Sequence, residues 1–101
     1  MYQPKALDVV KYTIDHDWYI VLVHEIRPVE IETATGHPRT IDEVLIEDIA
    51  VSNPSDFYEG VIWVDEPFTP EYLISIELLM SNCPDVDTFI TTHPEYLLWT
   101  N

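Results

Sequence analysis

Basic residues, cysteine and glycine are all scarce in this chain, and each shortage excludes a class of protein. Only four of the 101 residues are Lys or Arg, too few for a protein that itself neutralises nucleic-acid phosphates. The one cysteine, Cys83, cannot form the disulfide framework of a small secreted scaffold. Two glycines are too few for the loops that cradle phosphates, such as G-x-x-x-x-G-K and G-x-G-x-x-G.

Long apolar runs are also missing, although apolar residues are not. The longest run, Trp18 to Val23, is far shorter than the ~20 residues needed to cross a bilayer. The first residues lack the apolar core of a signal peptide. Hydrophobic residues still make up 47% of the chain, which separates it from disordered acidic tails. We therefore expect one acidic domain, residues 1–101, located in the cytoplasm, or in a host cytoplasm if the protein is viral.

Proline and asparagine divide the chain into short segments. Breaks are expected at 27–28, 36–38, 52–56, 66–67, 82–84 and 93–94. The residue pattern predicts strands over 7–14 and 18–26, joined as a hairpin by Asp15-His16-Asp17. It also predicts a half-exposed strand over 29–33, a loop over 35–40, strands over 57–64 and 87–92, and a final helical turn over 94–99.

Residues 41–51 are ambiguous between helix and strand. Thr40 followed by Asp42-Glu43 could begin a helix, whereas the β-branched residues that follow favour a strand. The acids do not fall on one helical face, and we predict a strand.

The strongest helix signal is Thr69-Pro70-Glu71, which places a capping residue, a proline and an acid in the order of a helix start. The predicted helix runs through Tyr72 to Met80 and ends before Pro84. Since strands come first and the main helix comes late, the sequence predicts an α+β fold. We expect an antiparallel sheet of about four to five strands, with one main C-terminal helix packed on one face.

Charge is distributed unevenly along the chain. Of the 19 acidic side chains, six lie in residues 1–39 together with all four basic ones. Residues 40–101 carry the other thirteen and neither Lys nor Arg. Because acidic proteins ordinarily place cations near their carboxylates, we expect most of these side chains to face water, a metal or a cationic partner. Their mutual repulsion opposes folding, so the charge is expected to serve binding.

Eight carboxylates of this cation-free stretch form the predicted partner-binding site. Their expected role is to take the place of nucleic-acid phosphates on a basic protein surface. Glu71 and Asp85 are left out because we expect them to cap helices. The eight are Asp42, Glu43, Glu47, Asp48, Asp56, Glu59, Asp65 and Glu66.

In charge and size, though in no motif, the chain resembles the small acidic inhibitors that phages use against restriction, CRISPR and other host nucleic-acid machinery. The expected function is therefore that of a DNA or RNA mimic without enzymatic activity. It would block the nucleic-acid site of a basic partner protein and bind neither nucleic acid nor membranes itself. Two alternatives stay open: an acidic accessory or immunity-type module whose target does not bind nucleic acid, and a small metal-dependent enzyme.

Other chemistry has little support in the sequence. His16, His24 and His93 each adjoin a carboxylate, but no H-E-x-x-H, C-x-x-C or EF-hand pattern accompanies them. Cys83 has no cation nearby in the sequence that would activate it as a nucleophile. Paired carboxylates are too common here to indicate acid–base catalysis. We therefore predict no cofactor and no dedicated metal site.

Overall fold

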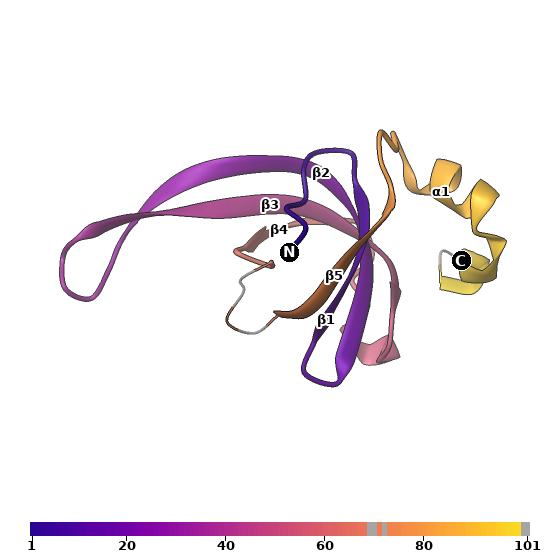
Figure 1. The fold of residues 1–101 in the computed structure, drawn as a ribbon, viewed down its shortest axis with the longest axis horizontal. Helices are drawn as coiled ribbons and strands as arrows, with labels where there is room; N and C mark the ends of the chain where they lie inside the picture. Colours follow the sequence, from indigo (N-terminus) through magenta and orange to yellow (C-terminus); the bar gives the residue numbers. More distant parts are fainter. Residues whose placement is uncertain (69–70, 72, 100–101) are drawn as a thin grey trace.

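Within the part of the chain that the structure describes, five antiparallel strands form one sheet, and short helical segments follow at the C-terminal end (Figure 1). A computed structural model describes residues 1–68, 71 and 73–99. The predicted α+β class is confirmed. The elements are β1 (Val9–Ile14), β2 (Asp17–Glu32), β3 (Pro38–Val51), the 3-10 turn η1 (Pro54–Asp56), β4 (Val61–Asp65), β5 (Leu73–Met80), helix α1 (Val86–Thr92) and the 3-10 segment η2 (Pro94–Trp99).

The sheet has the strand order β4-β3-β2-β1-β5, and every neighbouring pair is antiparallel. Strands β1 to β4 follow one another as a meander, and β5 lies at the opposite edge, beside β1. The predicted β1–β2 hairpin is confirmed, with Ile14 paired to Asp17 across the turn. Asp15 adopts a φ of 54° in this turn, a left-handed conformation that Asp tolerates better than most residues.

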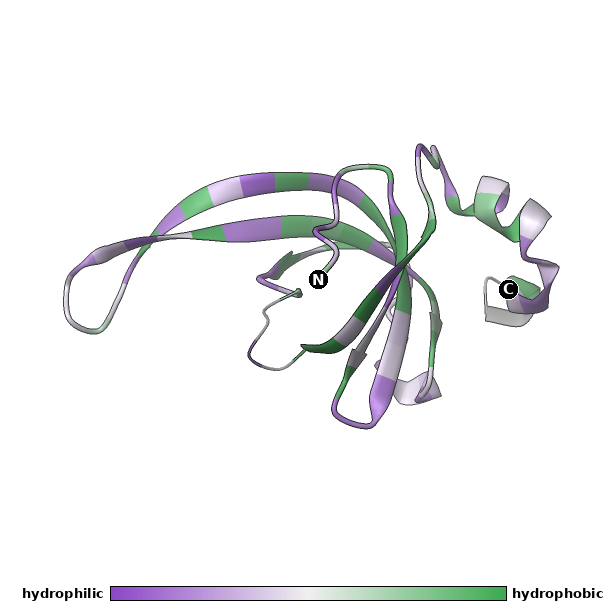
Figure 2. Ribbon diagram, viewed as in Figure 1, coloured by the Kyte–Doolittle hydropathy of each residue, from purple (hydrophilic) through white to green (hydrophobic). Residues whose placement is uncertain are grey.

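Strands β2 and β3 continue beyond their other neighbours as a two-stranded arm (Figure 1). The pairing reaches Glu32 and Pro38, next to a turn that contains Gly36 at a φ of 81°. Hydrophilic and hydrophobic residues alternate along this arm (Figure 2). The arm explains why the molecule measures 47 × 28 × 25 Å. The sequence correctly places a strand over 41–51, and that strand, β3, begins three residues earlier.

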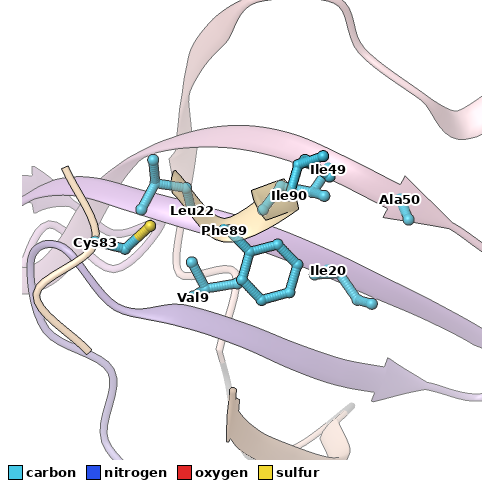
Figure 3. Packing of buried hydrophobic residues seen from close by; sticks show 8 residues of the cluster. All are labelled: Val9, Ile20, Leu22, Ile49, Ala50, Cys83, Phe89 and Ile90. Carbon is cyan, nitrogen blue, oxygen red and sulfur yellow. The ribbon is translucent and has the colours of Figure 1, made fainter. Parts of the chain in front are cut away.

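Both faces of the sheet carry buried side chains. Consecutive residues of β1 and of β2 are buried, and successive residues of a strand point to opposite faces. One face holds a cluster around Phe89 of α1, which packs among residues of β1, β2 and β3 (Figure 3). This Phe89 cluster consists of Val9, Ile20, Leu22, Ile49, Ala50, Cys83, Phe89 and Ile90. The other face holds a second cluster of Val10, Tyr12, Val21, Val23, Val44, Ile46 and Leu73.

The break expected at Arg27-Pro28 is wrong, because β2 runs through it and includes all of the strand predicted over 29–33 except its last residue. Pro28 lies opposite Asp42 in the arm. There β2 has only one neighbour, since β1 pairs with it no further than Leu22. A proline whose nitrogen faces the open side of a strand removes no ladder hydrogen bond.

Two other boundaries also differ from the sequence prediction. The loop expected over 35–40 ends earlier, because β3 begins at Pro38. The strand expected over 57–64 is β4, which begins only at Val61. Both differences lie beside proline or glycine, where pairing between strands decides the boundary more than local propensity does.

The helix predicted to run through Tyr72 to Met80 is wrong, because Leu73–Met80 is strand β5. Thr69 and Pro70 of its expected start signal, and Tyr72 of the expected helix, lie outside the described residues. Strand β5 pairs with the outer edge of β1, and pairing satisfies backbone groups that would otherwise be left open. Residues 74–78 alternate between apolar and polar side chains, a period-two pattern that favours a strand.

The strand predicted over 87–92 is also wrong, because these residues belong to helix α1. Asp85 caps the helix as expected, and its Oδ1 accepts a hydrogen bond from the Thr88 backbone N–H at 2.8 Å. Val86, Phe89 and Ile90 recur at helical spacing and all contact the Phe89 cluster. Glu71 has no such role, because the helix expected to begin there is absent. The last predicted helical turn is confirmed as η2.

Candidate partner-binding surface

All eight predicted carboxylates lie on the β3–β4 hairpin or directly beside it. Four belong to β3, Asp65 ends β4, and Glu66 follows it; Asp56 and Glu59 lie in the connection between the two strands. We call this part of the molecule the acidic edge. It comprises Asp42, Glu43, Glu47, Asp48, Asp56, Glu59, Asp65 and Glu66.

The eight carboxylates do not share one face. Glu43 lies directly opposite Asp65, and both point to the same side of the sheet as Glu47. Asp42 and Asp48 are each next to one of these residues on β3, so their side chains point to the other side of the sheet. The adjacent pairs Asp42-Glu43 and Glu47-Asp48 are therefore split between the two faces.

Arg27 of β2 reaches Glu43 across the sheet. Its Nε donates to Glu43 Oε1 at 2.7 Å, and Nη2 contacts the same oxygen. The guanidinium also lies 3.9 Å from the centre of the Trp63 ring on β4, which adds a cation–π contact. Three strands thus hold one arginine between a carboxylate and an aromatic ring.

Two further carboxylates of the acidic edge have a basic neighbour. Arg39 Nη2 contacts both carboxylate oxygens of Glu66, at 2.6 and 2.5 Å, and Glu66 raises the pKa of the guanidinium. His24 Nε2 lies 2.9 Å from Glu47 Oε1. These bases are distant in sequence, so inspection of the chain alone does not reveal the pairs.

The other five carboxylates form no ion pair within the part of the chain that the structure describes. Three of them are Asp42, Glu59 and Asp65, which are exposed. Asp56 is exposed as well, and Tyr19 Oη lies 3.5 Å from its Oδ2. Asp48 is half-buried and accepts the Tyr58 N–H at 3.0 Å. Burial raises the pKa of Asp48 above its ordinary value, against this hydrogen bond, and nearby Asp56 raises it further.

Acidic residues from several parts of the chain line a hollow of about 180 Å³. Glu47 and Asp48 of β3 line it together with Glu59. Asp87, in the first turn of α1, lines it as well, although it is not among the eight predicted residues. Its position in the cation-free stretch is the only signal in the sequence that could have indicated it. Over the described residues, no three His, Cys, Asp or Glu side chains are arranged to hold a metal ion.

A second hollow, of about 270 Å³, lies between the arm and the segment after β4. Its lining includes the apolar residues Ile26, Ile41, Val44 and Phe68, and Asp42 is one of its two acidic residues. We call it the Phe68 cleft. Its complete lining is Gln3, Pro4, Ile26, Thr40, Ile41, Asp42, Val44, Glu66, Pro67 and Phe68.

Cys83 is fully buried in the Phe89 cluster. Its Sγ lies 3.1 Å from the Asp85 carbonyl oxygen, to which the thiol donates. Burial raises the pKa of the thiol, which opposes formation of the nucleophilic thiolate. Its burial in the apolar cluster is typical of a structural cysteine.

No family model, curated protein or solved structure is significantly similar to this chain. The function must therefore be argued from the molecule itself. Within residues 1–68, 71 and 73–99, no helix has the length and apolar character needed to cross a bilayer.

Proposed function

We propose that this protein binds the nucleic-acid site of a basic partner protein through the acidic edge, and that it acts in the cytoplasm by blocking that site rather than by catalysis. The observation that carries the proposal is the absence of any Lys or Arg from residues 40–101, which hold thirteen acids. Such a distribution leaves the β3–β4 side of the sheet with charge that the chain itself does not neutralise.

The strand ladder supports the proposal because it fixes the carboxylates in space. Glu43 and Asp65 face each other on paired strands, where opposite side chains lie ~5 Å apart. Residues two apart on one strand are separated by ~7 Å. A charged surface with fixed spacings loses little conformational entropy on binding. It can therefore compete with phosphates for Arg and Lys side chains.

The ion pairs also shape the proposed surface. Arg27 and Arg39 reduce the charge at Glu43 and Glu66, and the His24 ring contacts the carboxylate of Glu47. The strongest contribution to binding is therefore expected from the exposed carboxylates without an ion pair, above all Glu59 and Asp65. Asp48 contributes less, because it is half-buried and its carboxylate already accepts the Tyr58 N–H.

An alternative function is favoured by apolar residues at the outer edge of β4. Val61 is 49% exposed and Ile62 is 36% exposed, and among the described residues β4 has no neighbour on that side of the sheet. A partner that contacts these side chains would be held partly by apolar burial, which does not require a nucleic-acid site. This is the accessory or immunity-type module, whose target does not bind nucleic acid.

Affinity capture from a cell lysate separates the two functions. Immobilised protein is incubated with the lysate at low and high salt, with and without duplex DNA or RNA as competitor. A mimic is expected to capture a nucleic-acid-binding protein that both salt and the competitor release. A partner that stays bound against the competitor supports the alternative function and contradicts mimicry.

A matched pair of variants tests whether the acidic edge is the surface used. Glu59→Lys/Asp65→Lys reverses two exposed acids of that edge, and Glu30→Lys/Glu32→Lys reverses two exposed acids of the arm. Both double variants change the net charge by the same amount. The first is expected to abolish capture, and the second to retain most of it. Equal losses would show that only total charge matters and that the acidic edge is not a site.

A further inference from the structure

The Phe68 cleft combines an apolar lining with a carboxylate that lacks an ion pair. Ile26 and Val44 pack against the second core cluster, so the cleft is continuous with the interior of the fold. Phe68 packs edge-on against Tyr12, with ring centroids 5.2 Å apart. Asp42 is exposed, and its side chain forms no ion pair with any described residue. The cleft therefore offers apolar atoms, an aromatic ring and a negative charge within one small volume.

The protein already holds one guanidinium in a comparable arrangement. Arg27 lies over the Trp63 ring and donates to the carboxylate of Glu43. In the Phe68 cleft, an aromatic residue and a carboxylate residue again line the same hollow. Arg39 is paired with both oxygens of Glu66, and Arg27 with Glu43. Asp42 has no ion pair with either arginine.

We propose that the Phe68 cleft receives an arginine side chain of the basic partner, with the guanidinium at Asp42 and the aliphatic stem against Ile26 and Phe68. This inference rests on the proposed function, since it assigns one anchoring contact to the same partner. The cleft adjoins the acidic edge through Asp42 and Glu66, which belong to both.

The dimensions and chemistry favour one arginine over other occupants. A volume of about 270 Å³ lies just below the ~300 Å³ lower end of small-molecule sites. A guanidinium is planar and less strongly hydrated than an ammonium, so it stacks on aromatic rings and leaves water more easily than lysine does. An uncharged apolar side chain would bury the Asp42 carboxylate without a partner, which is unfavourable.

The test is a titration of the full-length, ¹⁵N-labelled protein at low salt with two blocked tripeptides, Ac-Gly-Arg-Gly-NH₂ and Ac-Gly-Lys-Gly-NH₂. The arginine peptide is expected to shift the backbone amide signals of Ile26, Thr40 and Val44. It should bind at least threefold more tightly than the lysine peptide. Asp42→Asn is expected to weaken arginine binding at least fivefold. The backbone carbonyl of Asp42, which accepts the Glu66 N–H at 2.9 Å, is unchanged in this variant.

Asp15→Asn is the matched control, because Asp15 is exposed in the β1–β2 turn and Asn tolerates its positive φ. This variant should leave arginine binding unchanged. A second variant, Phe68→Leu, should remove the preference for arginine over lysine. Shifts spread evenly over the acidic surface, or equal effects of Asp42→Asn and Asp15→Asn, would overturn the proposed arginine site.

The titration and the lysate capture fail independently. If the capture identifies a partner released by the nucleic-acid competitor but the titration gives no localised shifts, the cleft inference is wrong and the proposed function stands. If the titration localises arginine to the cleft but capture yields no nucleic-acid-binding partner, the mimic function is wrong and the arginine site is supported.

Discussion

Phe89→Ala is expected to be strongly destabilising, because Phe89 joins α1 to the sheet. Its side chain is fully buried among Val9, Leu22 and other members of the Phe89 cluster. The ring also stacks on His93, with centroids 4.1 Å apart. A buried Phe→Ala change costs about 3–5 kcal/mol, a large share of the ~5–15 kcal/mol that stabilises a small domain. At about 4–8 °C per kcal/mol, the melting temperature should fall by more than about 10 °C.

Urea unfolding followed by circular dichroism measures this effect. Ile74→Ala on β5 is the control, because Ile74 is 62% exposed and its truncation should change the free energy of unfolding by less than about 0.5 kcal/mol. A loss below about 1 kcal/mol for Phe89→Ala would show that α1 does not pack on the sheet. The position of Asp87 beside Glu47 and Glu59 would then be wrong as well.

Three other predictions concern charge and buried polar groups. Burial raises the folded-state pKa of Asp48, so its ionised form opposes folding above that pKa. Asp48→Asn should therefore be more stable than the natural chain at pH 7. This difference in stability should disappear as the pH falls through the raised pKa toward the ordinary Asp pKa of 3.8. Urea titrations at a series of pH values measure it. The fully buried Asp8 carboxylate accepts hydrogen bonds from the Tyr2 hydroxyl at 2.5 Å and from the Lys5 N–H at 3.0 Å. Asp8→Ala should therefore lower the free energy of unfolding, measured by urea unfolding, by about 1–3 kcal/mol. An unchanged midpoint would mean that these bonds do not anchor the N-terminal segment. Raising NaCl from 10 to 500 mM should increase the melting temperature, since salt screens the repulsion that accompanies a net charge of −15, and a melting temperature that falls with salt would contradict this.

Strands β1 to β4 could be predicted from local patterns, whereas β5 was predicted as a helix and α1 as a strand. β-branched and aromatic residues indicate β2 and β3 correctly, and Asp15-His16 indicates the hairpin before β2. The sequence predicts a helix where β5 lies and a strand where α1 lies, because Thr69-Pro70-Glu71 resembles a helix start more closely than the residues around Asp85 do. Pairing with the open edge of β1 overrode that signal, and the 3.6-residue spacing of Val86, Phe89 and Ile90 was the better guide.

The sequence predicts which region of the chain forms the candidate site, but not how the side chains of that region are arranged. The cation-free stretch identifies β3 and β4 as the acidic part of the molecule. Which carboxylates are paired depends on strand register, and one residue of slip would send each side chain to the other face. The ion pairs Arg27–Glu43 and Arg39–Glu66 depend on the register in which β2, β3 and β4 pair. Asp87 joins Glu47 and Glu59 only because α1 folds back over the sheet.

The strand order has a consequence for how the chain folds as it is synthesised. Strands β1 to β4 pair with sequence neighbours and can form as they leave the ribosome. The outer edge of β1, however, stays open until β5 has been made, and the face beneath Phe89 stays uncovered even longer. Open sheet edges promote aggregation, and like charge keeps chains apart. The acidic residues of the meander should thus keep the half-built sheet soluble, so a chain ended after Asp65 should aggregate more readily as salt is raised.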